Sequence, residues 1–471
     1  MTGGTYQVRD PRTGEIHREL CPPAPAELAE AAARLRAAQP RWAALPAERR
    51  AAALLTWREE IAGAQDELVA ALTSDTGRLT ESVLEVGSVL GMLERWAGQA
   101  PELLTPPPPL QAAIPGIEIR GAGVPYPLVG VISPWNFPLL LGLIDAIPAL
   151  AAGCAVLAKP SEVTPRFIAP LMKTAAQVPD LADVITMVEG DGATGASIVR
   201  LVDAVAFTGS VPTGRIVAAA AAEAFIPAFL ELGGKDPAIV LAGADLDRAS
   251  SSVLWGATAN AGQSCLSIER VYVEEAAYEE FLDLLVRKAG RLTLAYPGPG
   301  DGQIGPLIDP AQAAVIERHL TDALEKGATV RCGGRMERLG GGRWCLPTVL
   351  TDVDHGMLVM TEETFGPIVP VMRVRDADHA VELANDSSYG LSAAVFASDS
   401  ASALSVADRL LVGAVSVNDS GLTAFVHEGE KNSFNSSGLG GSRMGPASLS
   451  RFLRRRSYLI NNSTGPDPWW H

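Results

Sequence analysis

From residue 128 onward, short apolar runs alternate with helix-like stretches, and this alternation constrains the fold more than any other feature of the sequence. Apolar runs occur at Leu128–Ser133, Ala155–Ala158, Val184–Val188 and Val202–Phe207, and each is followed by a loop and a stretch with helical spacing. Strands that alternate with helices form parallel sheets that carry helices on both faces. The sequence therefore predicts an α/β fold.

A second alternating block runs from residue 237 to residue 417. Its expected strands are Ala238–Leu241, Val271–Val273, Val369–Val374, Ala393–Ala397 and Ala414–Val417. Residues 25–99 instead carry apolar residues at helical spacing, which predicts several helices. Helices are also expected at Asn136–Leu150 and Arg166–Gln177, between strands of the first block.

Two segments fit neither block. Residues 114–130 alternate loosely between apolar and polar, which favours extended chain, and the prolines at 106–109 mark a linker before them. The tail from Gly438 is rich in glycine and serine. Its basic and apolar continuation, RFLRRRSYLI, predicts a helix end followed by a strand.

The net charge of −16 bears on partners rather than on the fold. A strongly acidic surface repels nucleic acid and anionic membranes, so neither is expected as a partner. The most apolar long stretch, Leu139–Ala158, contains Asp145 and Pro148, and we interpret it as a buried helix and strand rather than a membrane span. The N-terminal residues lack a signal-peptide pattern, so we expect a cytoplasmic protein.

Cysteine and histidine usage predicts neither a disulfide framework nor a metal site. The six histidines lack the HxxxH and HExxH spacings. The cysteines are odd in number, widely spaced and without a CxxC pair, which favours reduced thiols. They are Cys21, Cys154, Cys265, Cys332 and Cys345.

Two glycine-rich turns are candidates for a phosphate-binding loop. Residues 190–195, GDGATG, match GxGxxG after a strand, but no acidic residue about 20 positions on ends a second strand as a dinucleotide fingerprint requires. We interpret them as a strand-to-helix turn. Residues 207–214, FTGSVPTG, also open a helix, whose N-terminal N–H groups suit a pyrophosphate, and a plain turn is the alternative.

Three further residues are candidates for covalent chemistry, although none decides the function alone. A lone cysteine such as Cys265, in GQSC, is more often a small buried hydrophobic residue than a nucleophile. Glu231 precedes a Gly-Gly turn, where a carboxylate can activate water. Asn136 lies in PWNFP, where two prolines fix a short loop, so its amide can donate to an oxyanion.

Taken together, these motifs resemble the aldehyde dehydrogenase superfamily over nearly the whole chain. In order they are PWNFP at 134–138, KPSE at 159–162, FTGS at 207–210, ELGGK at 231–235, GQSC at 262–265, IGPLI at 304–308, EETFGP at 362–367 and YGLSAAVF at 389–396. Their order and spacing match the family, including the 34-residue step from Glu231 to Cys265.

The resemblance implies a fold and an assembly. A Rossmann-type dinucleotide-binding domain is expected from residues 1–113 and 129–233, and an α/β catalytic domain from residues 234–433. Residues 114–128 and 434–471 would form a small β oligomerisation extension with the C-terminal tail. Edge strands that pair across subunits imply a homodimer or homotetramer.

The resemblance also implies NAD(P)-dependent oxidation of a small-molecule aldehyde to the carboxylic acid. Cys265 would attack the aldehyde as a thiolate, while the amide of Asn136 and the backbone N–H of Cys265 would hold the oxyanion. Hydride transfer to a nicotinamide would leave a thioester, which water activated by Glu231 would hydrolyse.

The family's cofactor contacts match residues from several motifs. The glutamate at 162 favours NAD, because a carboxylate accepts both ribose hydroxyls and repels a 2′-phosphate, while Lys159 with Ser161 keeps NADP as the alternative. The residues expected to contact the cofactor are Ile132, Trp135, Lys159, Ser161, Glu162, Gly192, Gly209, Ser210, Gly214, Glu363 and Phe365.

The expected substrate pocket is mostly apolar and contains no arginine. It comprises Phe137, Leu141, Ile144, Ser264, Leu266, Leu422 and Phe425, with the first three placed by helical spacing from Asn136. This composition favours neutral aliphatic or aromatic aldehydes over semialdehydes that carry a carboxylate. The segment 432–438, NSFNSSG, departs from the Pro-Phe-Gly-Gly pattern of many family members. The substrate specificity of this chain is therefore harder to infer from the family.

Three other functions remain as alternatives. A CoA-acylating dehydrogenase would pass the thioester to CoA and often lacks the carboxylate at Glu231. A catalytically silent scaffold would be expected to lack Cys265, Asn136 or Glu231. A ketone or alcohol dehydrogenase built on the 190–195 turn would need a Tyr/Lys or zinc constellation, for which the sequence gives no sign.

Overall fold

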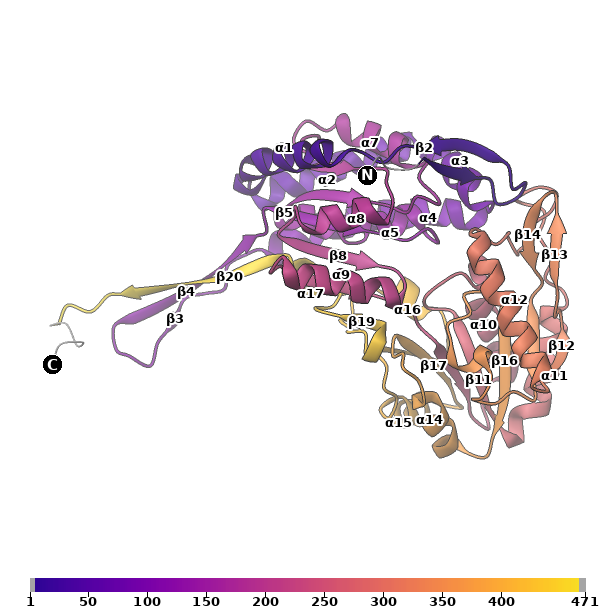
Figure 1. The fold of residues 1–471 in the computed structure, drawn as a ribbon. Coiled ribbons are helices and arrows are strands. Elements are labelled where there is room, and N and C mark those ends of the chain that lie inside the picture. The colour runs from indigo at the N-terminus through magenta and orange to yellow at the C-terminus, as the bar shows by residue number, and fades with distance from the viewer. Residues whose placement is uncertain (1–4, 466–471) are drawn as a thin grey trace.

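The computed structural model describes residues 5–465 and arranges them around two large sheets, with a narrow arm that projects from the body (Figure 1). Helices separate the strands of both sheets along the chain, and most neighbouring strands run parallel. The α/β class predicted from the alternating pattern is therefore confirmed.

The first sheet contains β5 (Leu128–Ile132), β6 (Ala155–Lys159), β7 (Ile185–Met187), β8 (Ala204–Thr208), β9 (Ala228–Glu231) and β19 (Gly438–Leu439). They lie in the order β19-β9-β8-β5-β6-β7, and only β19 is antiparallel to its neighbour. The chain leaves β7 and returns to β8 beside β5, so the strand order reverses between β5 and β8. The carboxyl ends of the strands at such a switch point form a ligand-binding crevice.

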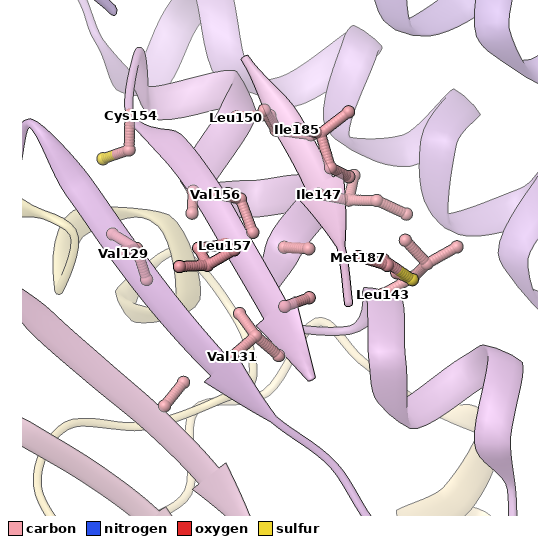
Figure 2. Packing of buried hydrophobic residues seen from close by; sticks show 14 of the residues in the cluster. Val129, Val131, Leu143, Ile147, Leu150, Cys154, Val156, Leu157, Ile185 and Met187 are labelled. Carbon is pink, nitrogen blue, oxygen red and sulfur yellow. The ribbon is translucent and has the colours of Figure 1, made fainter. Parts of the chain in front are cut away.

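Helices cover the first sheet and bury a large apolar core. They are α1 (Pro25–Ala44), α2 (Ala47–Gly63), α3 (Gln65–Thr76), α4 (Thr80–Leu103), α7 (Ile168–Ala176), α8 (Gly192–Val199) and α9 (Val211–Glu223). Figure 2 shows Val129 of β5 and Val156 of β6 within this core, together with Ile147 and Leu150. Because β5 and β6 are buried along their whole length, their sequences are continuous apolar runs.

The single helix expected at Asn136–Leu150 is wrong, because the structure has two short helices there, α5 (Pro138–Leu143) and α6 (Ala146–Ala152). The break at Ile144 and Asp145 lies just upstream of Pro148. A proline has no N–H to donate to the carbonyl four residues earlier and its ring clashes with it, so a continuous helix through Ile144 is disfavoured. Asn136 lies before both helices.

The apolar stretch at 139–158 is accordingly part of the core. It forms α5, α6 and β6, which are almost wholly buried, as the interpretation of a buried helix and strand requires. In the part of the chain that the structure describes, no helix combines the length and the apolar content needed to cross a membrane.

The second sheet confirms all five strands expected between residues 237 and 417. It contains β10 (Asp236–Val240), β11 (Ile268–Glu274), β12 (Thr329–Cys332), β15 (Thr348–Thr351), β16 (Ile368–Val374), β17 (Ser392–Phe396) and β18 (Ala414–Val417). Their order is β12-β15-β16-β11-β10-β17-β18, and only the β12–β15 pair is antiparallel. A separate hairpin joins β13 (Met336–Leu339) to β14 (Gly342–Cys345).

The helices that pack on the second sheet, or connect it to the first, vary in length. The longer ones are α10 (Leu246–Thr258), α11 (Glu275–Ala289), α12 (Pro310–Glu325), α14 (Ala377–Asn385) and α15 (Ser400–Ala407). Single turns form α13 (Leu358–Thr361), α16 (Leu422–Phe425) and α17 (Ala447–Ser450).

The projecting arm is a three-stranded sheet of β3 (Leu110–Gln111), β4 (Ile117–Pro125) and β20 (Leu453–Asn461). β20 pairs with β4 in antiparallel register along its whole length, and one edge of β20 has no strand beside it among the described residues. Figure 1 shows the arm extending away from both sheets. The extended chain predicted at 114–130 and the strand predicted after the basic tail are confirmed. At the other end of the described chain, β1 (Tyr6–Arg9) and β2 (Ile16–Leu20) form a hairpin.

Candidate active site

A cavity of about 890 Å³ brings the three predicted catalytic residues into one wall. Asn136 comes from the turn before α5, Glu231 from the last position of β9, and Cys265 from the loop before β11. The segments of Asn136 and Glu231 belong to the first sheet, whereas the loop of Cys265 leads into the second sheet. The fold therefore assembles the constellation that the motifs only suggested.

The loop that carries Cys265 follows an unusual turn after α10. This turn, η1 (Ala259–Gly262), ends at Gly262, which has a φ of +72°. A Cβ at this position would lie 2.3 Å from the carbonyl carbon of Gly366, so only glycine fits. The glycine of GQSC thus lets the loop of Cys265 approach the segment that contains EETFGP.

The amide of Asn136 is held against the chain just before the nucleophile. Its Nδ2 donates to the carbonyl oxygen of Gln263 at 3.1 Å. The side chain of Asn260 reinforces this contact, because its Nδ2 donates to the backbone oxygens of Asn136 at 3.1 Å and Gln263 at 2.9 Å. Since an amide nitrogen carries two hydrogens, one hydrogen of Asn136 Nδ2 remains for an oxyanion beside Cys265.

Buried charges support the turn that carries Asn136. Glu85 Oε2 accepts hydrogen bonds from the N–H groups of Leu139 and Leu140, at 3.0 and 3.1 Å. These N–H groups at the start of α5 have no partner within the helix, so Glu85 supplies one. Arg78 donates to the other oxygen of Glu85 at 2.8 Å and lies over the ring of Phe137. Burial raises the pKa of Glu85 to about 7. No sequence motif singled out either Glu85 or Arg78.

The environment of Cys265 favours the thiol over the thiolate. Burial, together with the nearby carboxylate of Glu363, raises the pKa of the Cys265 thiol to about 12. The positive charges of Lys431 and Arg443 act in the opposite direction. The resting residue is therefore protonated at neutral pH, and its proton must leave before it can act as a nucleophile.

A cluster of two arginines and one aspartate borders the cavity, and Arg443 is its member on the wall. Asp145 accepts hydrogen bonds from both Arg443 and Arg451, and Arg443 also donates to Thr208. Desolvation opposes the charge on Asp145, but the two arginines hold the pKa of its carboxyl below the usual value. Two arginines with one aspartate leave a surplus positive charge, and Arg443 places it on the wall shared by Glu231 and Cys265.

The predicted cofactor residues of the first sheet gather at its carboxyl edge. Ile132 ends β5, Lys159 ends β6, and Gly209 and Ser210 follow β8. Lys159 Nζ donates to Glu162 Oε2 and to the carbonyl oxygen of Gly190, both at 3.0 Å. Residues 190–195 follow β7 and include the first turn of α8, as expected of a strand-to-helix turn.

The starts of α8 and α9 at this edge suit the phosphates of a dinucleotide. A Cβ at Gly192 would meet no atom within 4 Å, so the start of α8 faces open space. Ser210 caps the start of α9, whose N–H groups suit a pyrophosphate. Gly214 has a different local role, because a Cβ there would collide with Leu232. Ser161 Oγ accepts the N–H of Val163, which shapes the loop after Lys159.

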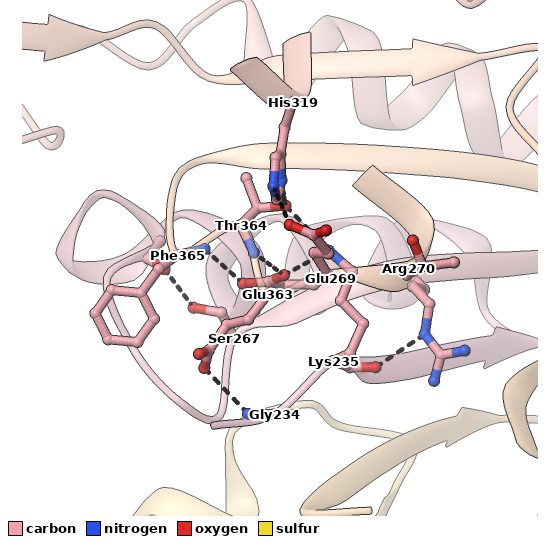
Figure 3. A network of polar contacts seen from close by, with 12 residues as sticks. Gly234, Lys235, Ser267, Glu269, Arg270, His319, Glu363, Thr364 and Phe365 are labelled. Atoms are coloured by element: carbon pink, nitrogen blue, oxygen red, sulfur yellow. Dashed lines mark hydrogen bonds and ion pairs between the residues drawn. The ribbon is translucent and has the colours of Figure 1, made fainter. Parts of the chain in front are cut away.

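The other two predicted cofactor residues, Glu363 and Phe365, are fixed by a buried polar network (Figure 3). Glu269 accepts the ammonium of Lys235 at 2.6 Å and the N–H groups of Thr364 and Phe365 at 2.7 and 2.8 Å. Glu363 accepts the N–H of Gly234 at 3.0 Å, and burial, with Glu269 nearby, raises the pKa of Glu363 to about 8.

Phe365 also links this network to the first sheet. Its ring lies edge-on to Trp135, with the ring centroids 5.4 Å apart. Trp135 neighbours Asn136, so predicted cofactor residues from the segments of both sheets meet beside Asn136. The sequence analysis missed Glu269 and His319, because neither belongs to a recognised motif. The ring of His319 forms a hydrogen bond with the Thr364 hydroxyl.

The cavity contains six of the seven predicted substrate residues. Phe137, Leu141, Ile144, Ser264, Leu266 and Phe425 line it. Leu422 does not line it, although the neighbouring Thr423 and Ala424 do. Successive residues of a helix point about 100° apart, so the first residue of the short helix α16 is turned away from its neighbours' direction. Phe137, Leu141 and Ile144 were chosen by helical spacing from Asn136. That spacing does not apply, because Asn136 precedes α5.

The cavity wall contains positive residues that the predicted set lacked. Lys288 is paired with Asp247 at 2.8 Å, and Arg443 is paired with Asp145. Arg291 and Lys431 complete the group of lysines and arginines on the wall. Among residues 5–465, no cluster of three His, Cys, Asp or Glu side chains is placed to hold a metal ion.

A family model described as the aldehyde dehydrogenase family matches residues 1–458. The chain belongs to the aldehyde dehydrogenase family. A solved structure from Anabaena variabilis, PutA, which carries the provisional description of an aldehyde dehydrogenase, has a TM-score of 0.97 and 57% identity, and the match covers 99% of this chain and 100% of that chain. The family and its fold, expected from the motifs, are confirmed.

Curated relatives in the aldehyde dehydrogenase family act on chemically different aldehydes. The 4,4'-diapolycopene aldehyde oxidase of Methylomonas sp is 40% identical over 80% of this chain and 71% of its own length. The NADP(+) succinate-semialdehyde dehydrogenase GabD of Escherichia coli is 35% identical over 81% of this chain and 79% of its own. Betaine aldehyde dehydrogenase from Staphylococcus aureus, solved with NAD+, has a TM-score of 0.93 and 29% identity, covering 99% of this chain and 94% of that one.

Proposed function

We propose that this chain oxidises an aldehyde to the carboxylic acid with NAD(P), through a thioester on Cys265. The observation that carries the proposal is the shared cavity wall of Asn136, Glu231 and Cys265, with the Asn136 amide hydrogen-bonded to the segment that presents the cysteine. A silent scaffold would have no reason to keep these three groups together.

The first half-reaction joins sulfur to the aldehyde carbon. The Cys265 thiol passes its proton to water in the cavity, the sulfur attacks the carbonyl carbon, and the negative charge moves to the former carbonyl oxygen. The free Nδ2 hydrogen of Asn136 and the backbone N–H of Cys265 stabilise that oxygen, and one such donor is typically worth about 3–4 kcal/mol of barrier. A bound nicotinamide dinucleotide supplies the hydride acceptor, and loss of the hydride leaves a thioester on Cys265.

The second half-reaction hydrolyses the thioester. The Glu231 carboxylate takes a proton from water, the water oxygen bonds to the acyl carbon, and the carbon–sulfur bond breaks to release the acid and the Cys265 sulfur. Glu231 supports hydrolysis over transfer to CoA, because transfer to a thiol does not need water activated at this position.

NAD is the preferred cofactor in this proposal. The Glu162 carboxylate stands beside Lys159 at the end of β6, where it would accept ribose hydroxyls and repel a 2′-phosphate. NADP remains the alternative, because Lys159 contributes a positive charge to the same place. A comparison of kcat/KM for the two cofactors at a fixed aldehyde concentration tests the preference.

We propose neutral aliphatic or aromatic aldehydes as substrates, because Leu140, Leu141, Ile144, Trp255 and Phe425 give the cavity a largely apolar wall. The second candidate is an aldehyde that carries a carboxylate, since Arg291 and Lys431 also lie on that wall. The cavity volume of about 890 Å³ far exceeds the needs of a four-carbon semialdehyde.

An aldehyde panel tests the proposed function. Hexanal, benzaldehyde and succinate semialdehyde are compared by kcat/KM, with formation of the reduced cofactor as the signal. Hexanal or benzaldehyde should be preferred, and Cys265→Ala should abolish turnover of every aldehyde. A strong preference for the semialdehyde would replace the first substrate class by the second, and full activity of Cys265→Ala would exclude the mechanism.

A further inference from the structure

The segment at 432–438, which departs from the family pattern, contacts the proposed general base directly. Ser433 Oγ donates a hydrogen bond to Glu231 Oε2 at 2.8 Å. Glu231 and Ser433 are each only partly exposed, and Glu231 also lines the cavity that contains Cys265. In the described part of the chain, Ser433 gives the only side-chain hydrogen bond to this carboxylate.

The backbone that follows Ser433 is fixed by several hydrogen bonds. Phe434 N donates to Gly390 O at 2.8 Å, and Ser436 N donates to Ser388 O at 2.9 Å. The next residue, Ser437, donates from its Oγ to Gly233 O at 2.7 Å, and the same Oγ accepts the N–H of Gly390 at 2.9 Å.

The same segment is also attached to the strand that carries Glu231. β19 begins at Gly438, which pairs with Glu231 in antiparallel register, and Leu232 N donates to Ser437 O at 2.8 Å. The segment therefore connects β9 to the second sheet, and the hydroxyl of Ser433 is presented from a rigid support rather than from a free loop.

We propose that Ser433 is a positioning residue that orients the Glu231 carboxylate for thioester hydrolysis. This inference rests on the proposed function, in which Glu231 is the general base. A hydrogen bond to Oε2 restricts rotation of the carboxylate and leaves Oε1 to accept the proton of the attacking water. Because a base must lie within hydrogen-bond reach of its water, a carboxylate free to rotate spends less time in the productive orientation.

The effect of Ser433 is confined to the second half-reaction. Formation of the thioester consumes no water and does not use Glu231 as a base, so loss of the hydroxyl should leave it unchanged. Hydrolysis should slow about tenfold, the size expected for the loss of one hydrogen bond to a charged group. The two half-reactions therefore respond differently, which a general loss of stability would not produce.

The test measures how the thioester divides between water and added hydroxylamine. Because hydroxylamine also condenses with free aldehydes, it is added in a second mix, after excess enzyme and NAD have consumed the hexanal. It then attacks the thioester without needing a base and gives the hydroxamate. With hexanal and NAD, Ser433→Ala should raise the ratio of hydroxamate to hexanoic acid about tenfold and leave the first-turnover rate of NADH formation unchanged. Ser433→Thr, which keeps the hydroxyl, should restore the wild-type ratio. Ser436→Ala, three residues away with no contact to Glu231, is the matched control and should behave as wild type.

A parallel Glu231→Gln variant separates this inference from the function on which it rests. If Glu231→Gln blocks hydrolysis while Ser433→Ala leaves the ratio unchanged, Ser433 has no positioning role and the proposed function stands. If Glu231→Gln leaves the rate of hydrolysis unchanged, the general-base assignment fails and the inference fails with it. Equal slowing of both half-reactions in Ser433→Ala would also overturn the proposal, because it indicates a structural defect.

Discussion

At the scale of the residue, the site depends on polar groups whose partners fix their direction. Asn136 is 2% exposed, and its amide is oriented by Gln263 O rather than by solvent. The sequence placed Asn136 in a rigid loop through its two prolines, and that reasoning agrees with the structure. Of the partners that orient it, Gln263 lies in the GQSC motif, whereas Asn260 comes from the turn before that motif and gave no signal in the sequence.

Removing the Asn136 amide should slow acylation. We expect Asn136→Ala to lower kcat about 10²- to 10³-fold, because one oxyanion donor is lost, with a smaller effect on cofactor affinity. Stopped-flow measurement of the first turnover of NADH formation checks the prediction. Asn385→Ala, which removes an amide far from the cavity, should retain wild-type rates. A normal first turnover in Asn136→Ala would show that another group holds the oxyanion.

At the scale of the element, two glutamates bring the loop after α13 onto the strand β11 and the turn before β10. Glu269 on β11 ties down the backbone of Thr364 and Phe365, and Glu363 bonds the N–H of Gly234. The EETFGP and ELGGK motifs were predicted separately, and the structure shows why they occur together. A Cβ at Gly233 would lie 2.4 Å from the Glu363 carboxylate, so this close approach requires glycine.

The raised pKa of Glu363, about 8, predicts how the stability of the cofactor-free protein depends on pH. Between the ordinary carboxyl pKa near 4.3 and pH 8, the folded chain keeps a proton that the unfolded chain has released. The free energy of unfolding should therefore fall as the pH rises through this window and level off above it. Glu85, with a pKa of about 7, and Asp236, also about 7, contribute in the same direction below pH 7.

A glutamine at 363 isolates this contribution. Between pH 7 and 8, the thermal midpoint should fall by a few degrees less in Glu363→Gln than in the wild type, because the glutamine side chain does not titrate. Thermal unfolding followed by circular dichroism at several pH values gives the comparison. Glu362→Gln, which changes the neighbouring half-exposed carboxylate, should keep the wild-type slope. Parallel slopes for Glu363→Gln and the wild type would contradict the assignment.

The same scale shows where sequence reasoning stops. The parallel strands were predictable because burial on both faces forces continuous apolar runs, as in β5, β6 and β10. The strands between residues 329 and 351 were missed, because β12 is mostly exposed and the glycines at 333–334 and 340–342 interrupt the pattern. The helix at 136–150 was drawn too long because apolar spacing outweighed the effect of Pro148.

At the scale of the whole molecule, the motifs predicted which residues meet but not what surrounds them. Cys265, Glu231 and Asn136 were found because each lies in a short local pattern. Ser433, Glu85 and Arg443 were missed, because each acts through a contact with a residue far away in the sequence. No local periodicity records such a contact, so only the fold reveals it.

The projecting arm predicts assembly. Within residues 5–465, one edge of β20 has no partner strand, and Leu459 on β20 is 72% exposed while Tyr458 is 48% exposed. Such an edge is an unfilled site for strand pairing, so we expect a homodimer or homotetramer in solution. Light scattering coupled to size-exclusion chromatography should give a mass at least twice that of one chain.

A charge on the arm should disturb this assembly. Leu459→Asp is expected to shift the protein towards smaller species, because it places a carboxylate in the proposed interface. Leu404→Asp, on an exposed position of α15, serves as the control and should assemble normally. A wild-type protein that is monomeric at all concentrations would contradict the role given to the arm.

The central claim is that Cys265 carries the acyl group, and mass spectrometry of the trapped intermediate tests it most directly. Glu231→Gln mixed with hexanal and NAD should accumulate a protein one hexanoyl group heavier than before, and peptide mapping should place the added mass on Cys265. Without NAD, no acyl group should form. An acyl group on any other cysteine, or continued turnover with no covalent species on Cys265, would contradict the account.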